Sequence, residues 1–264
     1  FGTESIEEDH AIRGDPGVCD AVDRLNRMRI PSTTYPYIMS LLLSFTNGDS
    51  SSSNTISCLE TVESFQIRRQ FCSIQSAGFH TLFKDMWQKC GNTASVSNLY
   101  EQITSTSGYE FPGDSKFVDN IKVANLYSKK PFLRYILHEY EFSMNGYNRP
   151  GPRELVLENY DDSTAEHIIP NVIAGSWWEN KVDAVEHEEL CNTWGNLVIL
   201  TRWDNEEAKR DPWERKRNLY LEESLYKSPK KVARDYPEEF NINQLKSRAS
   251  LLADWAVERW PKRT

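Results

Sequence analysis

The chain has 264 residues, of which 39% are hydrophobic and 27% charged, and its formal net charge is −8. This composition is typical of a soluble globular protein with one large domain or two smaller ones. The richest apolar stretch, residues 37–45, is about half as long as a membrane span requires, so no membrane partner is expected. The negative charge by itself argues against binding nucleic acid, because phosphate contacts need Lys and Arg. From residue 201 onward, however, 15 basic residues stand against 12 acidic ones, so charge does not decide the partner.

The cysteines and the first residues bear on where the protein works. The five cysteines are an odd number and include no C-x-x-C pair, which argues against a disulfide framework and a zinc knuckle. We therefore expect reduced thiols and a cytoplasmic protein. Residues 1–4 show neither an initiator Met nor a basic-then-apolar signal pattern, so we expect the chain to be a piece of a longer protein.

Helical signals dominate the first half of the chain. Residues 33–45 predict a helix that begins at two threonines and stops at Asn47-Gly48. After a serine-rich loop at residues 49–54, apolar residues at helical spacing predict a long helix over 56–71. Within it, Arg68-Arg69 is expected to be a surface pair, with a DNA contact as the alternative. Further helical patterns cover residues 79–89, 95–103, 115–124 and 129–142.

The pattern changes after a cluster of breaker residues at 145–152, which is the candidate domain boundary. We expect a helical domain over residues 1–147 and a second domain over 148–264. In the second domain, residues 154–158 and 195–201 predict strands. A charged helix is expected from Asp204 to about residue 223, with a break near Pro212, and an amphipathic helix over 242–260 closes the chain. The fold class is therefore α+β.

The chemistry is concentrated around Glu166-His167, with Pro170 three residues later. Neighbouring side chains of a strand point to opposite faces, so both residues can serve one site only if the chain turns there, and the proline supplies a reason for a turn. A second strand would deliver Asn205 at the start of a helix. Phosphodiester hydrolysis needs a base to deprotonate water and a cation to neutralise charge. Because Mg²⁺ binds few protein oxygens, one Glu carboxylate and one Asn carbonyl suit it.

These stretches together resemble a known family. Glu166-His-Ile-Ile-Pro170, followed by Gly195-Asn-Leu197 and Asn205, resembles the HNH, or ββα-metal, nuclease motif. With the downstream Pro212-Trp-Glu-Arg-Lys216, it is similar to the C-terminal nuclease domain of modification-dependent restriction proteins of the GmrSD and phosphorothioate-sensing SspE type. The close likeness covers about residues 155–220. In such proteins the module follows an N-terminal sensor and nucleotide-hydrolysing domain.

The resemblance implies a role for each matching residue. His167 would be the general base, Glu166 and Asn205 the ligands of Mg²⁺ or Mn²⁺, and Asn196 the brace of the loop that orients His167. No third His follows the motif, since His187 precedes the second strand in a polar run and is expected at the surface. The basic residues after the motif are candidate DNA contacts, with a solvated helix face as the alternative for the run 215–217; these candidates are Lys209, Lys216 and Arg217.

The function implied is metal-dependent cleavage of double-stranded DNA, by nicking, as the effector part of an anti-phage restriction protein. Two alternatives stay open. One is a non-catalytic nucleic-acid-binding or scaffold module with a degenerate metal site, and the other is an RNase toxin. Metal-dependent conversion of supercoiled plasmid separates the first alternative from a nuclease, and cleavage of RNA in the same assay identifies the second.

Overall fold

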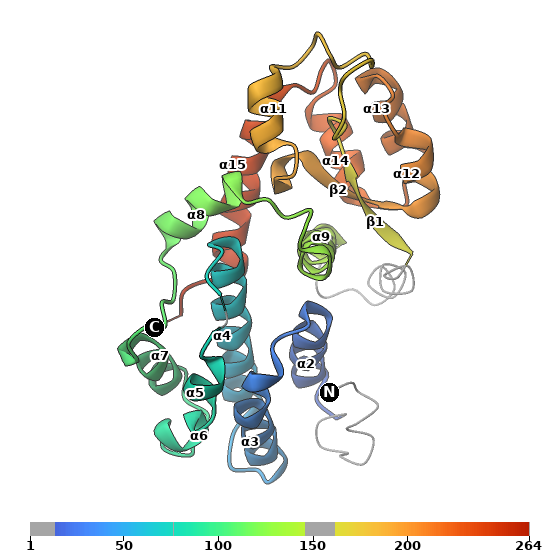
Figure 1. Ribbon diagram of the computed structural model, residues 1–264. Helices are drawn as coiled ribbons and strands as arrows, with labels where there is room; N and C mark the ends of the chain where they lie inside the picture. Colours follow the sequence, from blue (N-terminus) through green and yellow to red (C-terminus); the bar gives the residue numbers. More distant parts are fainter. Residues whose placement is uncertain (1–13, 76, 146–161, 264) are drawn as a thin grey trace. The chain divides into compact units, whose positions relative to one another are not determined.

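The computed structural model describes residues 14–75, 77–145 and 162–263 (Figure 1). Its internal packing divides the chain into two compact units. Unit 1 comprises Phe1–Val118 with Trp255–Thr264, and unit 2 comprises Asp119–Asp254. The domain boundary expected after residue 147 lies outside the described residues and stays a prediction.

Unit 1 is built from helices around one central helix. Helix α4 is buried along most of its length, including Leu59, Val62 and Phe65, so it forms the core of this unit. Its first turn is capped by the Ser51 side chain, which accepts a hydrogen bond from the Asn54 amide at 3.2 Å. The elements of this unit are α2 (Pro16–Met28), η2 (Ser32–Thr34), α3 (Tyr35–Thr46), α4 (Ser52–Phe71), α5 (Phe79–Phe83), α6 (Met86–Lys89), α7 (Val96–Ser105) and the first part of α8 (Asp114–Val123).

The arginine pair of α4 is wrong as a surface prediction, because both side chains are buried. The Arg68 guanidinium donates to the carbonyls of Trp260 at 2.8 Å and Pro112 at 3.0 Å. Arg69 donates to the carbonyl of Glu110 at 2.9 Å. Both arginines therefore hold the chain of unit 1 together and are withdrawn from any DNA surface.

Unit 2 contains a two-stranded antiparallel sheet, β1 (Ser163–His167) and β2 (Leu197–Thr201). In its register Ser163 lies opposite Thr201 and His167 opposite Leu197. The helices of this unit are α9 (Lys130–Asn145), α11 (Ala184–Leu190), η3 (Trp194–Asn196), α12 (Arg202–Ala208), α13 (Trp213–Glu222), α14 (Lys227–Asp235) and most of α15 (Ile242–Arg259).

The sheet is covered on both faces, since the consecutive residues Leu197–Leu200 of β2 are all buried. Helix α9 packs against both strands, α12 packs against both, and α14 packs against β2 (Figure 1). Burial of the apolar side chains of β2 between these helices fixes the sheet, and with it the residues at the end of β1.

Helix α15 holds the start of β2 at close range. The buried Arg248 guanidinium donates to the carbonyls of Trp194 and Gly195, each at 2.8 Å, and to that of Leu197 at 3.1 Å. A Cβ on Gly195 would lie 2.8 Å from the Leu245 carbonyl oxygen and 3.0 Å from Ala249 Cβ. The glycine therefore allows the backbone before β2 to approach the helix.

The α+β class is confirmed, with a mostly helical chain and a small sheet. Of the strand expected over 195–201, residues 197–201 form β2, whereas 195 and 196 belong to η3. The break near Pro212 is confirmed as the gap between α12 and α13. Helices α2, α11 and α14 were not predicted, and the helix expected over 79–89 is two short helices. The strand expected over 154–158 lies outside the described residues. All five cysteines are free, and no helix in the described ranges is long and apolar enough to cross a membrane.

The contact at Gly195 gives a stability prediction. Gly195→Ala should lower the free energy of unfolding by about 1–3 kcal/mol, because the added methyl group must displace the α15 backbone. Urea unfolding followed by tryptophan fluorescence measures the change. Gly113→Ala is the control, since a Cβ there meets no atom within 4 Å. Equal unfolding midpoints for wild type and Gly195→Ala would contradict the close packing of η3 on α15.

Candidate active site

The two motif residues lie at the end of β1, and their side chains leave the strand on opposite faces. His167 is the last residue of the strand, and the chain bends at Ile168 and Ile169 before Pro170. The turn expected from the proline is present, but it begins after His167. Glu166 and His167 therefore have different neighbours.

Glu166 forms a buried ion pair with Lys216 of α13. The Lys216 ammonium lies 2.5 Å from Glu166 Oε1 and donates to the backbone carbonyl of His167 at 2.7 Å. Lys216 is 0% exposed and Glu166 5% exposed, which withdraws this lysine from both a phosphate contact and a solvated helix face. Burial raises the pKa of Glu166 and lowers that of Lys216, and the opposite charge of each partner counteracts the shift.

The His167 ring is held by two contacts from other segments. Its Nε2 lies 3.0 Å from Asn192 Oδ1, and its centroid lies 4.5 Å from that of the Tyr127 ring. Because an amide oxygen only accepts hydrogen bonds, Nε2 carries the proton and Nδ1 is the basic nitrogen. Burial lowers the pKa of His167 below its usual value, so the imidazole is neutral at physiological pH. A neutral, oriented imidazole can accept a proton from water.

The bend after His167 is fixed by buried polar side chains. Asn196 accepts a hydrogen bond from the Ile169 amide at 2.8 Å and donates to the Ile169 carbonyl at 2.8 Å and the Cys191 carbonyl at 2.9 Å. His187 bonds the Pro170 carbonyl at 2.9 Å. The expectation that His187 lies at the surface is wrong, because it is 5% exposed. Asn196 thus clamps the segment two residues beyond His167.

Asn205 lies beside β1 in the first turns of α12, a helix capped by Thr201. Its amide nitrogen lies 3.3 Å from Thr164 Oγ1 and 3.4 Å from the Ala165 carbonyl oxygen. Asn205 bonds the Thr164 side chain and Lys216 bonds the Glu166 side chain. Residues 164 and 166 share one face of β1, so both partners approach the strand on the side of Glu166. Asn205 Oδ1 accepts no hydrogen bond from any residue that the structure describes.

The donor set suits a hard cation with few protein ligands. The carbonyl oxygen of half-buried Asn205 is available, and an amide oxygen is a ligand that Mg²⁺ accepts. The Glu166 carboxylate lies on the same side of β1 but already neutralises Lys216. Within the described ranges no three His, Cys, Asp or Glu side chains gather into a metal cluster, as a structural Zn²⁺ site would require.

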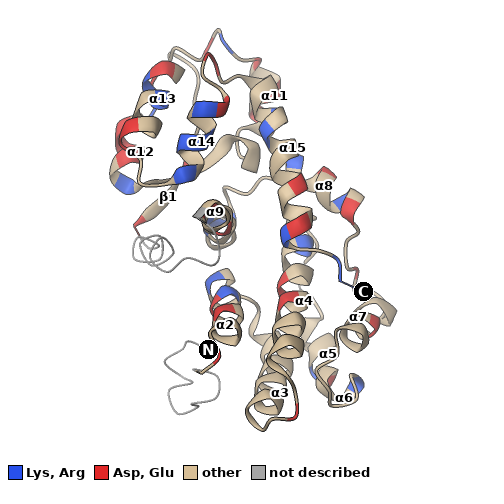
Figure 2. Ribbon diagram, turned by 180° about the vertical axis from the view of Figure 1, so that it is seen from behind, with Lys and Arg blue, Asp and Glu red and all other residues tan. Residues whose placement is uncertain are grey.

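The other two predicted DNA contacts differ in their exposure. Lys209 is exposed and directly follows α12, a helix that carries both acidic and basic residues (Figure 2). Arg217 is half-buried and donates to the Pro237 carbonyl at 2.7 Å. Of the three, only Lys209 is exposed.

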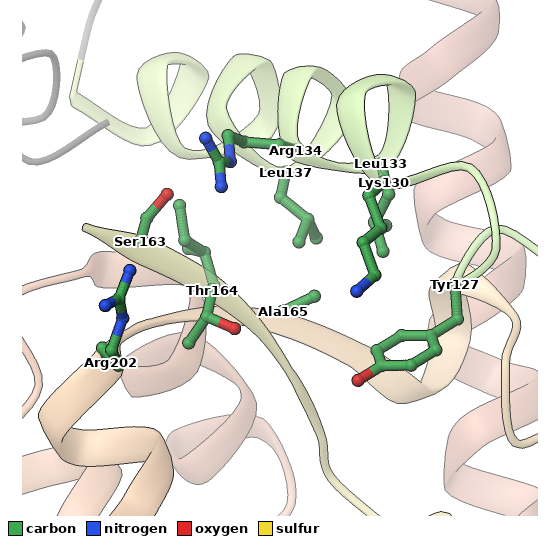
Figure 3. A pocket seen from close by; sticks show the side chains of 10 residues that line it. Tyr127, Lys130, Leu133, Arg134, Leu137, Ser163, Thr164, Ala165 and Arg202 are labelled. Carbon is green, nitrogen blue, oxygen red and sulfur yellow. The ribbon is translucent and has the colours of Figure 1, made fainter. Parts of the chain in front are cut away.

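Sequence reasoning missed a basic pocket over β1 and the two side chains that hold His167. The pocket is lined by Tyr127, Lys130, Leu133, Arg134, Leu137, Ser163, Thr164, Ala165, Ile199 and Arg202 (Figure 3). Lys130 and Arg134 are four residues apart in a predicted helix, which puts them on one helix face. That spacing was the available signal, but it did not reveal that the face lies against β1.

The buried ion pair gives a second stability prediction. Lys216→Met should destabilise the protein by about 3–5 kcal/mol, because it leaves the Glu166 carboxylate buried without its partner. Adding Glu166→Gln should recover part of that loss. The control is Lys231→Met, which breaks an exposed pair with Asp235 and should cost at most about 1 kcal/mol. Urea unfolding of the four proteins tests this, and a loss for Lys216→Met as small as for the control would contradict it.

Residues 111–255 match the family described as GmrSD restriction endonucleases, C-terminal domain. No curated protein matches the chain. The family match contains both strands, helices α9 and α11–α14, and every residue of the candidate site. It also covers more than half of the chain, and the match therefore shows that this chain belongs to the GmrSD restriction endonuclease family, through the C-terminal domain of those enzymes.

Proposed function

We propose that this chain is a metal-dependent DNA endonuclease of the HNH, or ββα-metal, type, with His167 as its general base. The observation that carries the proposal is the geometry around His167. Its Nε2 is bonded to Asn192, which leaves Nδ1 as the basic nitrogen, and its ring packs against Tyr127. Burial lowers its pKa, which favours the neutral imidazole that a base needs. Membership of a restriction endonuclease family supports DNA as the substrate.

In the proposed reaction, His167 Nδ1 takes a proton from a water molecule as the water oxygen attacks the phosphorus. The P–O bond to one sugar oxygen breaks, and that leaving oxygen takes up a proton from solvent. Tyr127 packs against the imidazole, and Asn192 fixes the tautomer. Asn196 and His187 hold the bend that follows, so the ring position does not depend on a mobile loop. Holding a general base in the correct orientation contributes much of its acceleration of the reaction.

The proposed metal is Mg²⁺ or Mn²⁺, held by Asn205 Oδ1 and the Glu166 carboxylate, with water and phosphate oxygens completing its shell. When bound, it would neutralise negative charge on the phosphate and on the leaving oxygen. Lys216 would share the Glu166 carboxylate with the metal and keep that side chain in place. His167 leaves β1 on the other face, so a phosphate that serves both groups would lie across the end of the strand.

We base the proposed wider role on the resemblance to modification-dependent restriction proteins. The substrate is double-stranded DNA, cut by nicking, and the chain is the effector part of an anti-phage, modification-dependent restriction protein that works in the cytoplasm. Phosphorothioate is the modification suggested by the likeness to SspE. Its sensor and nucleotide-hydrolysing domain would belong to the same full-length protein, outside this sequence.

One observation favours a second candidate, a non-catalytic nucleic-acid-binding or scaffold module. The Glu166 carboxylate is already paired with Lys216 and is 5% exposed, as in a metal site that has degenerated. This module would bind nucleic acid without cutting it, whereas the endonuclease would relax supercoiled plasmid only when Mg²⁺ or Mn²⁺ is present.

The catalytic prediction concerns His167→Ala. This change should lower the rate of plasmid nicking with Mg²⁺ by roughly 10²–10⁴, because the attacking water loses its base. DNA affinity should change little, because an uncharged imidazole makes no ion pair with a phosphate. The rate is measured by the conversion of supercoiled to open-circular plasmid, with and without a chelator.

His80→Ala is the matched control, because His80 is exposed and lies in unit 1. It should nick plasmid at the wild-type rate. A folded His167→Ala protein that is as fast as wild type would remove the general-base role, and a wild type that binds DNA but never cuts it would favour the scaffold module.

A further inference from the structure

The pocket over β1 has a basic lining. It encloses a cavity of about 200 Å³ between α9, β1 and the start of α12. Three cationic side chains line it, Lys130 and Arg134 from α9 and Arg202 from α12, and the described residues of the lining include no Asp or Glu. In Figure 3, Arg134 and Arg202 lie toward Ser163, whereas Lys130 lies toward Tyr127. The pocket lining therefore carries positive charge at both ends of the pocket.

Two of these three charges have no ionic partner within the described part of the chain. Lys130 and Arg202 are exposed, and neither makes an ion pair with another described residue. A second pocket, between α12 and α13, shows the contrast. Its cations are paired, Arg215 with Asp211 at 3.2 Å and Lys216 with Glu166 at 2.5 Å. In a chain with net charge −8, unpaired cations around one hollow indicate an anionic ligand.

The same pocket leads to the candidate base. Tyr127 lines it and contacts the His167 ring, with 4.5 Å between the ring centroids. Ser163, Ala165 and His167 alternate along β1 and so share one face of the strand. From Ser163 to His167 the strand rises about 13 Å, at about 3.3 Å per residue. A DNA backbone that follows this face would therefore run from Ser163 to His167.

We propose that this pocket binds the sugar–phosphate backbone of the DNA strand that is presented to His167, with Lys130 and Arg202 as phosphate contacts. Ser163 and Thr164 also line the pocket, but their hydroxyl groups already bond His138 and Asn205, so the phosphate contacts come from the cations. Contacts of this kind position DNA without reading its sequence. The inference rests on the proposed function. It assigns the phosphate contact first expected of Lys216, which is buried, to two residues that are exposed.

The test measures binding without cleavage. The wild-type chain is titrated with a fluorescently labelled DNA duplex in a chelator, and anisotropy is recorded over a range of salt concentrations. Lys130→Ala/Arg202→Ala should weaken binding and reduce the slope of log affinity against log salt by about two, since each side chain removed leaves one phosphate without its cation. Its melting temperature should stay at the wild-type value, since both side chains are exposed.

Lys230→Ala/Arg234→Ala is the control, because it also removes one lysine and one arginine from unit 2 and neither residue lines the pocket. Its salt slope should match that of the wild type. An equal fall in both double variants would indicate a general effect of net charge and overturn the proposal. So would an unchanged slope for Lys130→Ala/Arg202→Ala. If the wild-type protein nicks plasmid but the salt slope of Lys130→Ala/Arg202→Ala is unchanged, only the pocket proposal is rejected. If the wild-type protein binds no DNA, the proposed function is rejected as well.

Discussion

The ammonium of Lys216 holds the end of β1, and the geometry of the candidate site depends on it. This one group bonds the Glu166 carboxylate and the His167 carbonyl while it is fully buried. Replacing such a pair with apolar residues often costs little, whereas removing one partner costs several kcal/mol. The ammonium therefore acts mainly by fixing position, because it bonds the last two residues of β1 to α13. Asn196 then clamps the chain at Ile169, so His167 is restrained on both sides.

The two faces of β1 carry different groups of the candidate site. One face carries Glu166, with Asn205 and Lys216 beside the strand, and is where we propose the metal. The other carries His167, the proposed base, whose ring packs against Tyr127 and whose pKa is lowered by burial. The basic pocket lies along that second face. In our account, a DNA backbone lies in the pocket and brings one phosphate to the end of the strand, where base and metal act on it from either side.

The residues of the motif could be predicted because local patterns carry them. A Pro after Glu166-His167 indicates a bend, and a β-branched run after Gly195 indicates a strand. The burial of Lys216 could not be predicted, because it depends on a carboxylate 50 positions away in the chain. Likewise, α9 has an ordinary amphipathic pattern, and only tertiary packing places Lys130 over β1. Helix α2 was within reach, since Asp15 caps it and Pro16 begins it.

The central claim is that base, metal and phosphate meet at the end of β1. Anomalous scattering from Mn²⁺ in crystals of the His167→Ala protein with a DNA duplex tests it most directly. The account predicts a metal peak about 2.0–2.2 Å from Asn205 Oδ1, with a DNA phosphate beside it and the backbone running past Lys130 and Arg202. DNA bound on another surface, with no metal at Asn205, would contradict it.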